Sequence, residues 1–186
     1  MGNYVCNFVL FHFATITATN QQITSDQFQQ SNNTFKHYGL KDKISHLNND
    51  FDIKIPQSNY LISINQARNC MTHRRGIVGS EDCIDSKELI VKWNGIDVYA
   101  ETPSGEKISL LNIPKGGVEL PEGSKGIEAF PERIRNFTLG TLVNFSPRDL
   151  AEICRFTLIQ SNEVIKATEE YAIKKRNPNY QSINIC

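Results

Sequence analysis

The hydrophobic pattern of the first 50 residues predicts helices. Apolar side chains recur at roughly helical spacing over residues 8–35, and the stretch at 18–22 leaves room for a break. Gly39 follows this run and is expected to act as the C-cap of the helix. The next apolar stripe has the spacing of a short amphipathic helix and consists of Leu40, Ile44 and Leu47.

A further helix is predicted from about residue 57 to residue 75, after a connector at 50–56. Gly76 is expected to end this helix. Its apolar stripe should be formed by side chains at positions i, i+4, i+7 and i+11, namely Tyr60, Ile64, Ala67 and Met71.

Alternation of apolar and polar residues replaces the helical pattern between residues 81 and 145. It covers 89–93 and 96–100, and Asn94-Gly95 separates the two runs. Asn-Gly between alternating runs predicts a β-hairpin with a two-residue turn. The other features expected in this zone are a turn at 103–105, a third strand over 107–110, a loop over 112–126 and a second pair of strands at 133–137 and 141–145.

The last zone predicts one long helix from residue 146 to about residue 175. Ser146 is a suitable N-cap, and Pro147 suits the first helical position. Apolar residues follow with heptad-like spacing. The expected fold class is therefore mainly α: an antiparallel helical bundle in one domain over 1–186. Its β-hairpin-rich insertion at 81–145 would lie between the last two long helices.

Composition and charge narrow the class of protein. Hydrophobic residues make up 39% and charged residues 22% of the 186 positions, which excludes a disordered chain and a polytopic membrane protein. The 20 basic residues balance the 20 acidic ones, so a generally basic nucleic-acid coat protein is excluded, but a local basic patch is not. The apolar stretch at 5–18 is too short and too polar to span a membrane, and a buried helix is expected there in preference to a signal peptide.

Cysteine usage bears on compartment and cofactors. The five cysteines form no C-x-x-C pair, and their number is odd. Neither a zinc site nor a secreted disulfide framework follows, and the scattered histidines indicate no metal cluster. We therefore expect a cytoplasmic protein with reduced thiols, no metal, no other cofactor and no membrane partner.

One stretch of the chain stands out for its charge. No Asp or Glu occurs between Asp52 and Glu81. The same stretch contains five side chains that carry or can acquire positive charge: Lys54, Arg68, His73, Arg74 and Arg75. Such a local cationic patch on a neutral protein is suited to binding phosphate.

The spacing of three residues on the predicted helix points to a particular chemistry. Asn69 and His73 are four residues apart and share a face, while Arg68 lies about 140° from His73 around the axis, within reach of a long side chain. In RNA cleavage the 2′-hydroxyl attacks the adjacent phosphorus, and no metal is needed. A histidine can move the proton, an arginine can hold the charge that develops on the phosphate, and an asparagine can orient either group.

The segment Arg68-Asn69-x-x-x-His73 resembles the R-N-x-x-x-H signature of HEPN domains (higher eukaryotes and prokaryotes nucleotide-binding). The residues that follow, 74–78 and the expected hairpin, are similar to a bacterial HEPN-like group. The resemblance implies an all-helical bundle that forms a homodimer with a composite site. It also implies a metal-independent endoribonuclease of toxin–antitoxin or antiviral defence systems, held by an antitoxin or a defence-complex partner.

On this resemblance Arg68 and His73 would be catalytic and Asn69 would support them. Lys54, Arg74 and Arg75 would bind the phosphates of RNA. Two alternatives fit the same residues: a non-catalytic HEPN-like scaffold of a defence or regulatory complex, and an RNA- or nucleotide-binding subunit without turnover.

A purely structural interpretation also stands. Cations are favoured at the C-terminus of a helix by its dipole, and Arg68, His73, Arg74 and Arg75 all suit that position. The acidic run at 81–85 is expected to be a solvated loop. Trp93 is expected to pack or to fix strand register and not to bind a base.

Overall fold

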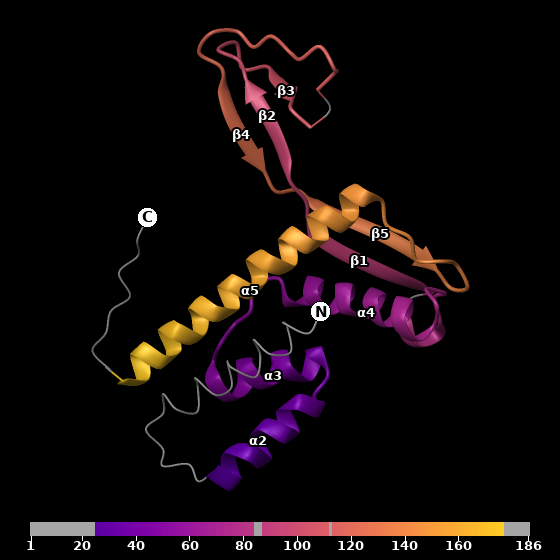
Figure 1. The fold of residues 1–186 in the computed structure, drawn as a ribbon, viewed down its shortest axis with the longest axis vertical. Helices are drawn as coiled ribbons and strands as arrows, with labels where there is room; N and C mark the ends of the chain where they lie inside the picture. Colours follow the sequence, from indigo (N-terminus) through magenta and orange to yellow (C-terminus); the bar gives the residue numbers. More distant parts are fainter. Residues whose placement is uncertain (1–24, 84–86, 112, 177–186) are drawn as a thin grey trace. The chain divides into compact units, whose positions relative to one another are not determined.

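The computed structural model describes residues 25–83, 87–111 and 113–176 (Figure 1). The part of the first expected helix before residue 25, and the apolar stretch at 5–18, lie outside the described residues. The elements in chain order are α2 (Ser25–His37), α3 (Leu40–Phe51), α4 (Ser58–His73), a 3-10 turn η1 (Ser80–Asp82), β1 (Glu88–Asn94), β2 (Asp97–Glu101), β3 (Lys107–Ser109), β4 (Lys125–Ala129), β5 (Glu132–Thr138) and α5 (Pro147–Arg176).

The expectation of a mainly α, antiparallel helical bundle is wrong. The described chain is a mixed α and β structure, with two small antiparallel sheets beside its helices. The chain divides into two compact units. One is formed by Met1–Ile62 with Thr157–Cys186, and the other by Ser63–Phe156. The second unit contains both sheets, together with most of α4 and the first turns of α5.

The first unit has a small aliphatic core in which α3 takes part. Ile44 and Leu47 of α3 are buried, which confirms the predicted amphipathic helix, and they pack with Ile53, Ile55 and Val164. Gly39 does not end α2 in a left-handed conformation as expected. Its φ of −65° is extended backbone at the N-cap of α3.

The helix α4 is confirmed between the expected bounds, but its buried face differs from the predicted stripe. The buried residues are Ser63, Ala67 and Cys70, whereas Met71 is 48% exposed. The buried face includes a serine because Ser63 Oγ accepts a hydrogen bond of 3.0 Å from the backbone N–H of Lys92 in β1. In the second unit α4 therefore covers the strand edge of β1 that β5 leaves open (Figure 1).

The hairpin predicted at Asn94-Gly95 does not exist. β1 pairs with β5, and β2 pairs with β3 and β4. The register is the same in both sheets. Asn94 pairs with Glu132 at the end of β1–β5, and three residues further along each strand Asp97 pairs with Ala129 at the start of β2–β4. The chain thus continues straight through Gly95 into β2, and returns through Phe130-Pro131 into β5, as one long two-stranded ribbon interrupted at a single point.

Two other expectations for this zone have different outcomes. The turn at 103–105 and the third strand are confirmed, since β2 and β3 form a hairpin and Gly105 has a φ of +84°. The expected strand at 141–145 is wrong, because that segment makes only an isolated bridge between Leu142 and Ile77.

The start of α5 is confirmed at Pro147, with Ser146 as its N-cap. Ser146 Oγ accepts from the backbone N–H of Asp149 at 3.1 Å, and the carboxylate of Asp149 accepts from the N–H of Ser146 at 3.0 Å. This reciprocal arrangement satisfies donors that the helix itself leaves unpaired.

Candidate functional site

The first two residues of the sequence motif touch each other on α4. The guanidinium Nη1 of Arg68 donates to the amide Oδ1 of Asn69 at 3.0 Å, and both side chains are half-buried. This hydrogen bond fixes the direction of the guanidinium and leaves the NH₂ group of Asn69 as a donor. The contact joins the charge-stabilising and orienting groups of the expected chemistry.

His73 is the last residue of α4 and is exposed. Because α4 is helical from Ser58 to His73, Asn69 and His73 lie four residues apart on one face, as predicted. Within the described part of the chain the imidazole of His73 makes no hydrogen bond or ion pair. The structure therefore brings Arg68 and Asn69 together and leaves the imidazole of His73 open to solvent.

Arg74 is held by the acidic run that was expected to be a solvated loop. Its Nε donates to Asp82 Oδ2 at 2.8 Å, its Nη2 bonds the other carboxylate oxygen of Asp82, and Glu81 lies at 3.5 Å from Nε. Asp82 is only 2% exposed. The expectation of a solvated acidic loop is thus wrong for Asp82, whose buried carboxylate neutralises Arg74.

The electrostatics around Asp82 explain why this pair persists. Burial by itself would raise the pKa of the Asp82 carboxyl, but hydrogen bonds from Arg74 and from the N–H of Gly79 outweigh it and hold the pKa below its ordinary value. Next to it, burial and the Asp82 charge raise the pKa of the Cys70 thiol. Cys70 is therefore a protonated core residue and not an activated thiolate.

The remaining two cationic candidates are exposed. Arg75 has a φ of +55° and Gly76 a φ of +80°, so two left-handed residues turn the chain away from the end of α4. Lys54 lies in the connector between α3 and α4 and belongs to the first unit, whereas the other five candidates belong to the second. Within the described residues neither Arg75 nor Lys54 has an ion-pair partner.

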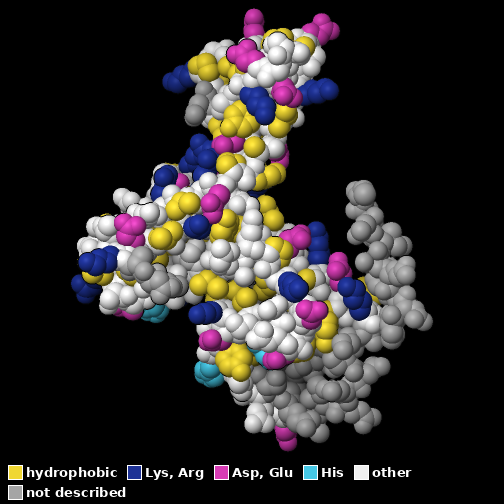
Figure 2. All heavy atoms as spheres, turned by 180° about the vertical axis from the view of Figure 1, so that it is seen from behind, with side chains coloured by type: hydrophobic (Ala, Val, Ile, Leu, Met, Phe, Trp, Pro, Cys, Tyr) yellow, Lys and Arg dark blue, Asp and Glu magenta, His cyan; other side chains and the backbone are white. Residues whose placement is uncertain are grey.

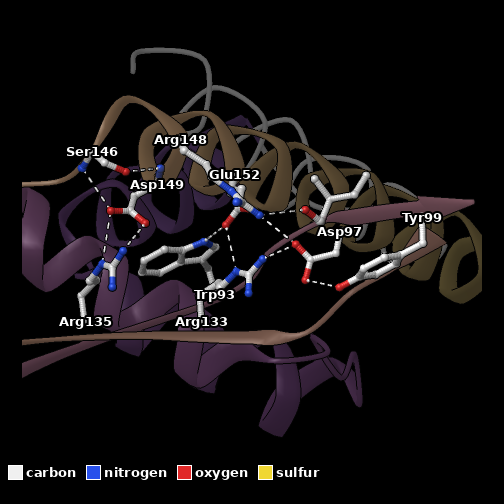
Figure 3. Close-up of polar contacts among 10 residues, drawn as sticks. Trp93, Asp97, Tyr99, Arg133, Arg135, Ser146, Arg148, Asp149 and Glu152 are labelled. Carbon is white, nitrogen blue, oxygen red and sulfur yellow. Dashed lines mark hydrogen bonds and ion pairs between the residues drawn. The ribbon is translucent and has the colours of Figure 1, made fainter. Parts of the chain in front are cut away.

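A second polar constellation was missed by sequence reasoning and is centred on Glu152 of α5 (Figure 3). Glu152 is 5% exposed, and its Oε2 accepts from Trp93 Nε1 at 3.0 Å and from Arg133 Nε at 3.4 Å. Its Oε1 accepts from Arg148 Nε at 3.0 Å. Trp93 is fully buried, as expected for a packing residue.

The network extends from Glu152 to both sheets. Asp97 accepts from Arg133 Nη2 at 2.6 Å, from Arg148 Nη2 at 2.8 Å and from Tyr99 at 3.3 Å. Burial would raise the pKa of Asp97 and of Glu152, but the donated hydrogen bonds and the arginine charges outweigh it and lower both values. All of these carboxylates are therefore ionised and paired at neutral pH.

Asp149 forms a separate ion pair at the start of α5. It accepts two hydrogen bonds from Arg135 of β5, at 3.2 Å from Nε and 3.0 Å from Nη2. Burial would raise the pKa of the Asp149 carboxyl, but the bonds from Arg135 and Ser146 hold it low. The first turn of α5 is thus fastened to β5 by charge as well as by capping.

Gly95 makes room for the network at the break between β1 and β2. A Cβ on Gly95 would lie 2.5 Å from Arg133 Nε and 2.8 Å from Glu152 Oε2. The Asn-Gly pair that signalled a hairpin therefore has a steric role. The signal that could have revealed the network is the pair Arg133 and Arg135 on one face of a strand, together with Asp149 and Glu152 in the first turns of the next helix.

The two constellations differ in what they can do chemically. Every carboxylate of the Glu152 network already accepts from protein donors, so this network fastens the first turns of α5 to the two sheets. The end of α4 combines an oriented guanidinium with an exposed imidazole, which suits an anionic substrate. Among the described residues, no three His, Cys, Asp or Glu side chains are grouped so that they could hold a metal ion.

Comparisons of the chain with protein-family models, with curated proteins and with solved structures found no significant match. None of the described helices combines the length and the apolar character that crossing a membrane requires.

Proposed function

We propose that this protein is a metal-independent endoribonuclease that acts through Arg68, Asn69 and His73 at the end of α4. The observation that carries the proposal is the contact between Arg68 and Asn69 on the helix that presents His73 to solvent. The absence of acidic residues from 53 to 80 supports it, since anionic substrates are not repelled by that segment.

In the proposed reaction His73 accepts the proton of a 2′-hydroxyl as the oxygen attacks the adjacent phosphorus. The new O2′–P bond replaces the P–O5′ bond, and the protonated His73 returns the proton to the departing 5′-oxygen. Arg68 stabilises the charge of the five-coordinate phosphorus, and Asn69 holds Arg68 in place. The products are a 2′,3′-cyclic phosphate and a 5′-hydroxyl.

Arg75 and Lys54 are proposed to bind the RNA backbone. Arg74 takes a lesser part, because Asp82 already occupies its guanidinium. A homodimer, an antitoxin or defence-complex partner and a cytoplasmic location are further parts of the proposal, which the HEPN resemblance and the cysteine usage support.

A specific observation favours a second candidate, an RNA-binding subunit without turnover. In the described chain the imidazole of His73 makes no hydrogen bond with the side chain of Asn69 or Arg68, and His73 occupies the last turn of a helix, where a cation is stabilised by the dipole alone. In that case the cations bind phosphate but no proton is transferred.

Cleavage of a fluorescent mixed-sequence RNA in EDTA separates these functions. The wild type should cleave the RNA, and His73→Ala and Arg68→Ala should each lower the rate by about 100-fold or more. His37→Ala is the matched control, because His37 is also an exposed histidine in the last turn of a helix, and it should leave the rate unchanged.

Binding measured by fluorescence anisotropy on the same RNA completes the test. Binding without cleavage by the wild type would replace the nuclease with the RNA-binding subunit. Cleavage that survives both substitutions at α4 would remove these residues from the active site.

A further inference from the structure

The second unit carries an exposed apolar surface next to the end of α4, here named the tip and consisting of Ile77, Leu139 and Leu142. Their exposed fractions are 51%, 53% and 61%. Soluble proteins seldom expose several large aliphatic side chains together unless a partner covers them.

Backbone pairing holds the tip together. The N–H of Val143 donates to Gly76 at 2.7 Å, and the N–H of Gly140 donates to Val78 at 2.9 Å. Within this short ladder Val78 and Val143 are buried, whereas Ile77 and Leu142, which face each other in the bridge, are exposed. The exposure is therefore built into the pairing.

Positive charge flanks the tip. Arg75 precedes Gly76 directly, and the backbone oxygen of Lys87 accepts from the N–H of Leu139 at 3.1 Å. Both side chains are exposed, and within the described residues neither forms an ion pair. Arg74 adds no free charge here, because Asp82 neutralises it.

A second exposed apolar surface, here named the arm, lies on the connection from β3 to β4. It consists of four aliphatic side chains that are each 38–48% exposed: Leu111, Ile113, Val118 and Leu120. Glu119 and Glu122 flank Leu120, are exposed, and have no ion-pair partner in the described chain. Figure 2 shows hydrophobic side chains interspersed with acidic and basic ones on the visible face of this sheet and its connection, at the top of the view.

The acidic character continues over the whole sheet that bears the arm. Residues 97–129 contain three basic side chains, Lys107, Lys115 and Lys125, against six acidic ones: Asp97, Glu101, Glu106, Glu119, Glu122 and Glu128. On the connection itself Glu119 and Glu122 outnumber the exposed Lys115, so the arm is apolar with a net acidic surround, whereas Arg75 and Lys87 lie beside the apolar tip.

We propose that the arm of one copy of this chain binds the tip of a second copy. Apolar side chains meet apolar side chains in this contact, and Glu119 and Glu122 meet Arg75 and Lys87. The contact joins two different surfaces, so two copies close a dimer by exchanging arms, or a chain of copies grows if the exchange does not close. This contact uses Arg75, which is also proposed above to bind the RNA backbone, but it needs none of the three residues Arg68, Asn69 and His73, so its failure would leave the proposed RNA chemistry standing.

Two charge-reversed variants test the contact by sedimentation equilibrium of the full chain without RNA. The tip-reversed variant carries Arg75→Glu and Lys87→Glu, and the arm-reversed variant carries Glu119→Lys and Glu122→Lys. In each variant alone tip and arm have the same sign, so we expect self-association to weaken by about tenfold or more relative to the wild type.

Mixing the two variants is the decisive step. The negative tip of one variant then faces the positive arm of the other, and the remaining pair is the natural one, so association between the variants should return to the strength of the wild type. This rescue also shows that both variants are folded. Raising the salt from about 0.05 M to about 0.5 M should weaken the association of the wild type.

Three results would overturn the proposal. The first is a wild type that stays monomeric at every concentration. The second is self-association that both reversals leave unchanged or that mixing does not restore. The third is a monomer whose tip instead binds vesicles of anionic phospholipid, with binding lost in the tip-reversed variant, because a lipid surface would then be the occupant of the tip.

Discussion

Asp82 and Glu81 are neighbours that both approach Arg74, yet their surroundings differ. The side chain of Asp82 is 1% exposed and that of Glu81 is 58% exposed. Asp82→Asn should lower the free energy of unfolding by about 3 kcal/mol, because it removes the buried counter-charge of the Arg74 guanidinium and leaves only the exposed Glu81 near it.

Urea unfolding followed by Trp93 fluorescence measures this loss, since Trp93 is the only tryptophan and lies in the same unit. Glu81→Gln is the matched control and should change the free energy of unfolding by no more than about 0.5 kcal/mol. Equal effects of the two substitutions would show that burial does not set the strength of this pair.

Gly95 is required for a steric reason, since its φ is not in the left-handed region. In Gly95→Ala the new methyl group would meet the Nε of Arg133 and the Oε2 of Glu152, which themselves are paired and cannot both withdraw. We expect a loss of about 1–3 kcal/mol in the free energy of unfolding.

Gly126→Ala provides the comparison for this substitution. Gly126 lies in β4 at a position where a Cβ would meet no atom within 4 Å, and its φ is also outside the left-handed region. Thermal unfolding of the two variants should show a lower midpoint only for Gly95→Ala. A similar midpoint for both would contradict the close approach at Gly95.

At the scale of elements, the start of α5 rests on Ser146. Ser146→Ala removes the oxygen that accepts from the N–H of Asp149 and should lower the free energy of unfolding by about 1 kcal/mol. Ser161→Ala on the same helix is the control, because Ser161 Oγ only donates back to the carbonyl of Thr157. That substitution should be neutral or slightly stabilising in urea unfolding, since alanine has the higher helix propensity.

Local signals were enough to predict the helices. The apolar stripe of α3, the extent of α4 and the cap of α5 at Ser146 are each written within a few neighbouring residues, and the structure confirms them. β1, β2, β3 and β5 were placed correctly along most of their length, and the β2–β3 hairpin was expected, but β4 was not predicted and the partners of β1 and β5 were wrong. Residues 89–93 pair with a strand 40 to 48 positions later, and no local pattern around Asn94-Gly95 encodes that choice.

In the candidate site, too, local features were predictable from the sequence and long-range contacts were not. A helical period alone was sufficient to place Asn69 and His73 on one face of α4. The ion pair between Arg74 and Asp82 was not predictable in this way, because Asp82 belongs to an acidic run that is typical of a solvated loop. Only the fold beyond the helix, with the turn at η1, buries that carboxylate against Arg74.

For the molecule as a whole the numbers of basic and acidic residues are equal, but the arginines differ in whether they pair with a carboxylate. Arg74, Arg133, Arg135 and Arg148 each pair with a buried carboxylate, whereas in the described chain Arg68 and Arg75 pair with none. The paired arginines stabilise the fold of the second unit. The unpaired ones lie in or next to the segment for which we propose RNA chemistry.

This pairing predicts how stability depends on pH. The pKa values of Asp82, Asp97, Asp149 and Glu152 are all held below their ordinary values in the folded state. The unfolded chain therefore binds more protons than the folded chain as the pH falls below about 5. The stability that these groups contribute is present above their unfolded pKa values of about 4 and is lost as the pH falls through the lower folded values.

Glu152→Gln tests this dependence at the centre of the network. An amide can accept at one end only, so its NH₂ group would face an arginine or the indole N–H of Trp93, and stability at pH 7 should fall by about 3 kcal/mol. The further loss between about pH 5 and pH 3 should be smaller than in the wild type, because one of the four carboxylates no longer titrates. Urea unfolding with Trp93 fluorescence across this range measures both effects.

Glu163→Gln is the control for this substitution. It alters only an exposed pair with Lys166 on the same helix and should reproduce the profile of the wild type. A Glu152→Gln profile parallel to that of the wild type would show that Glu152 titrates alike in the folded and unfolded chains, contrary to the network seen here.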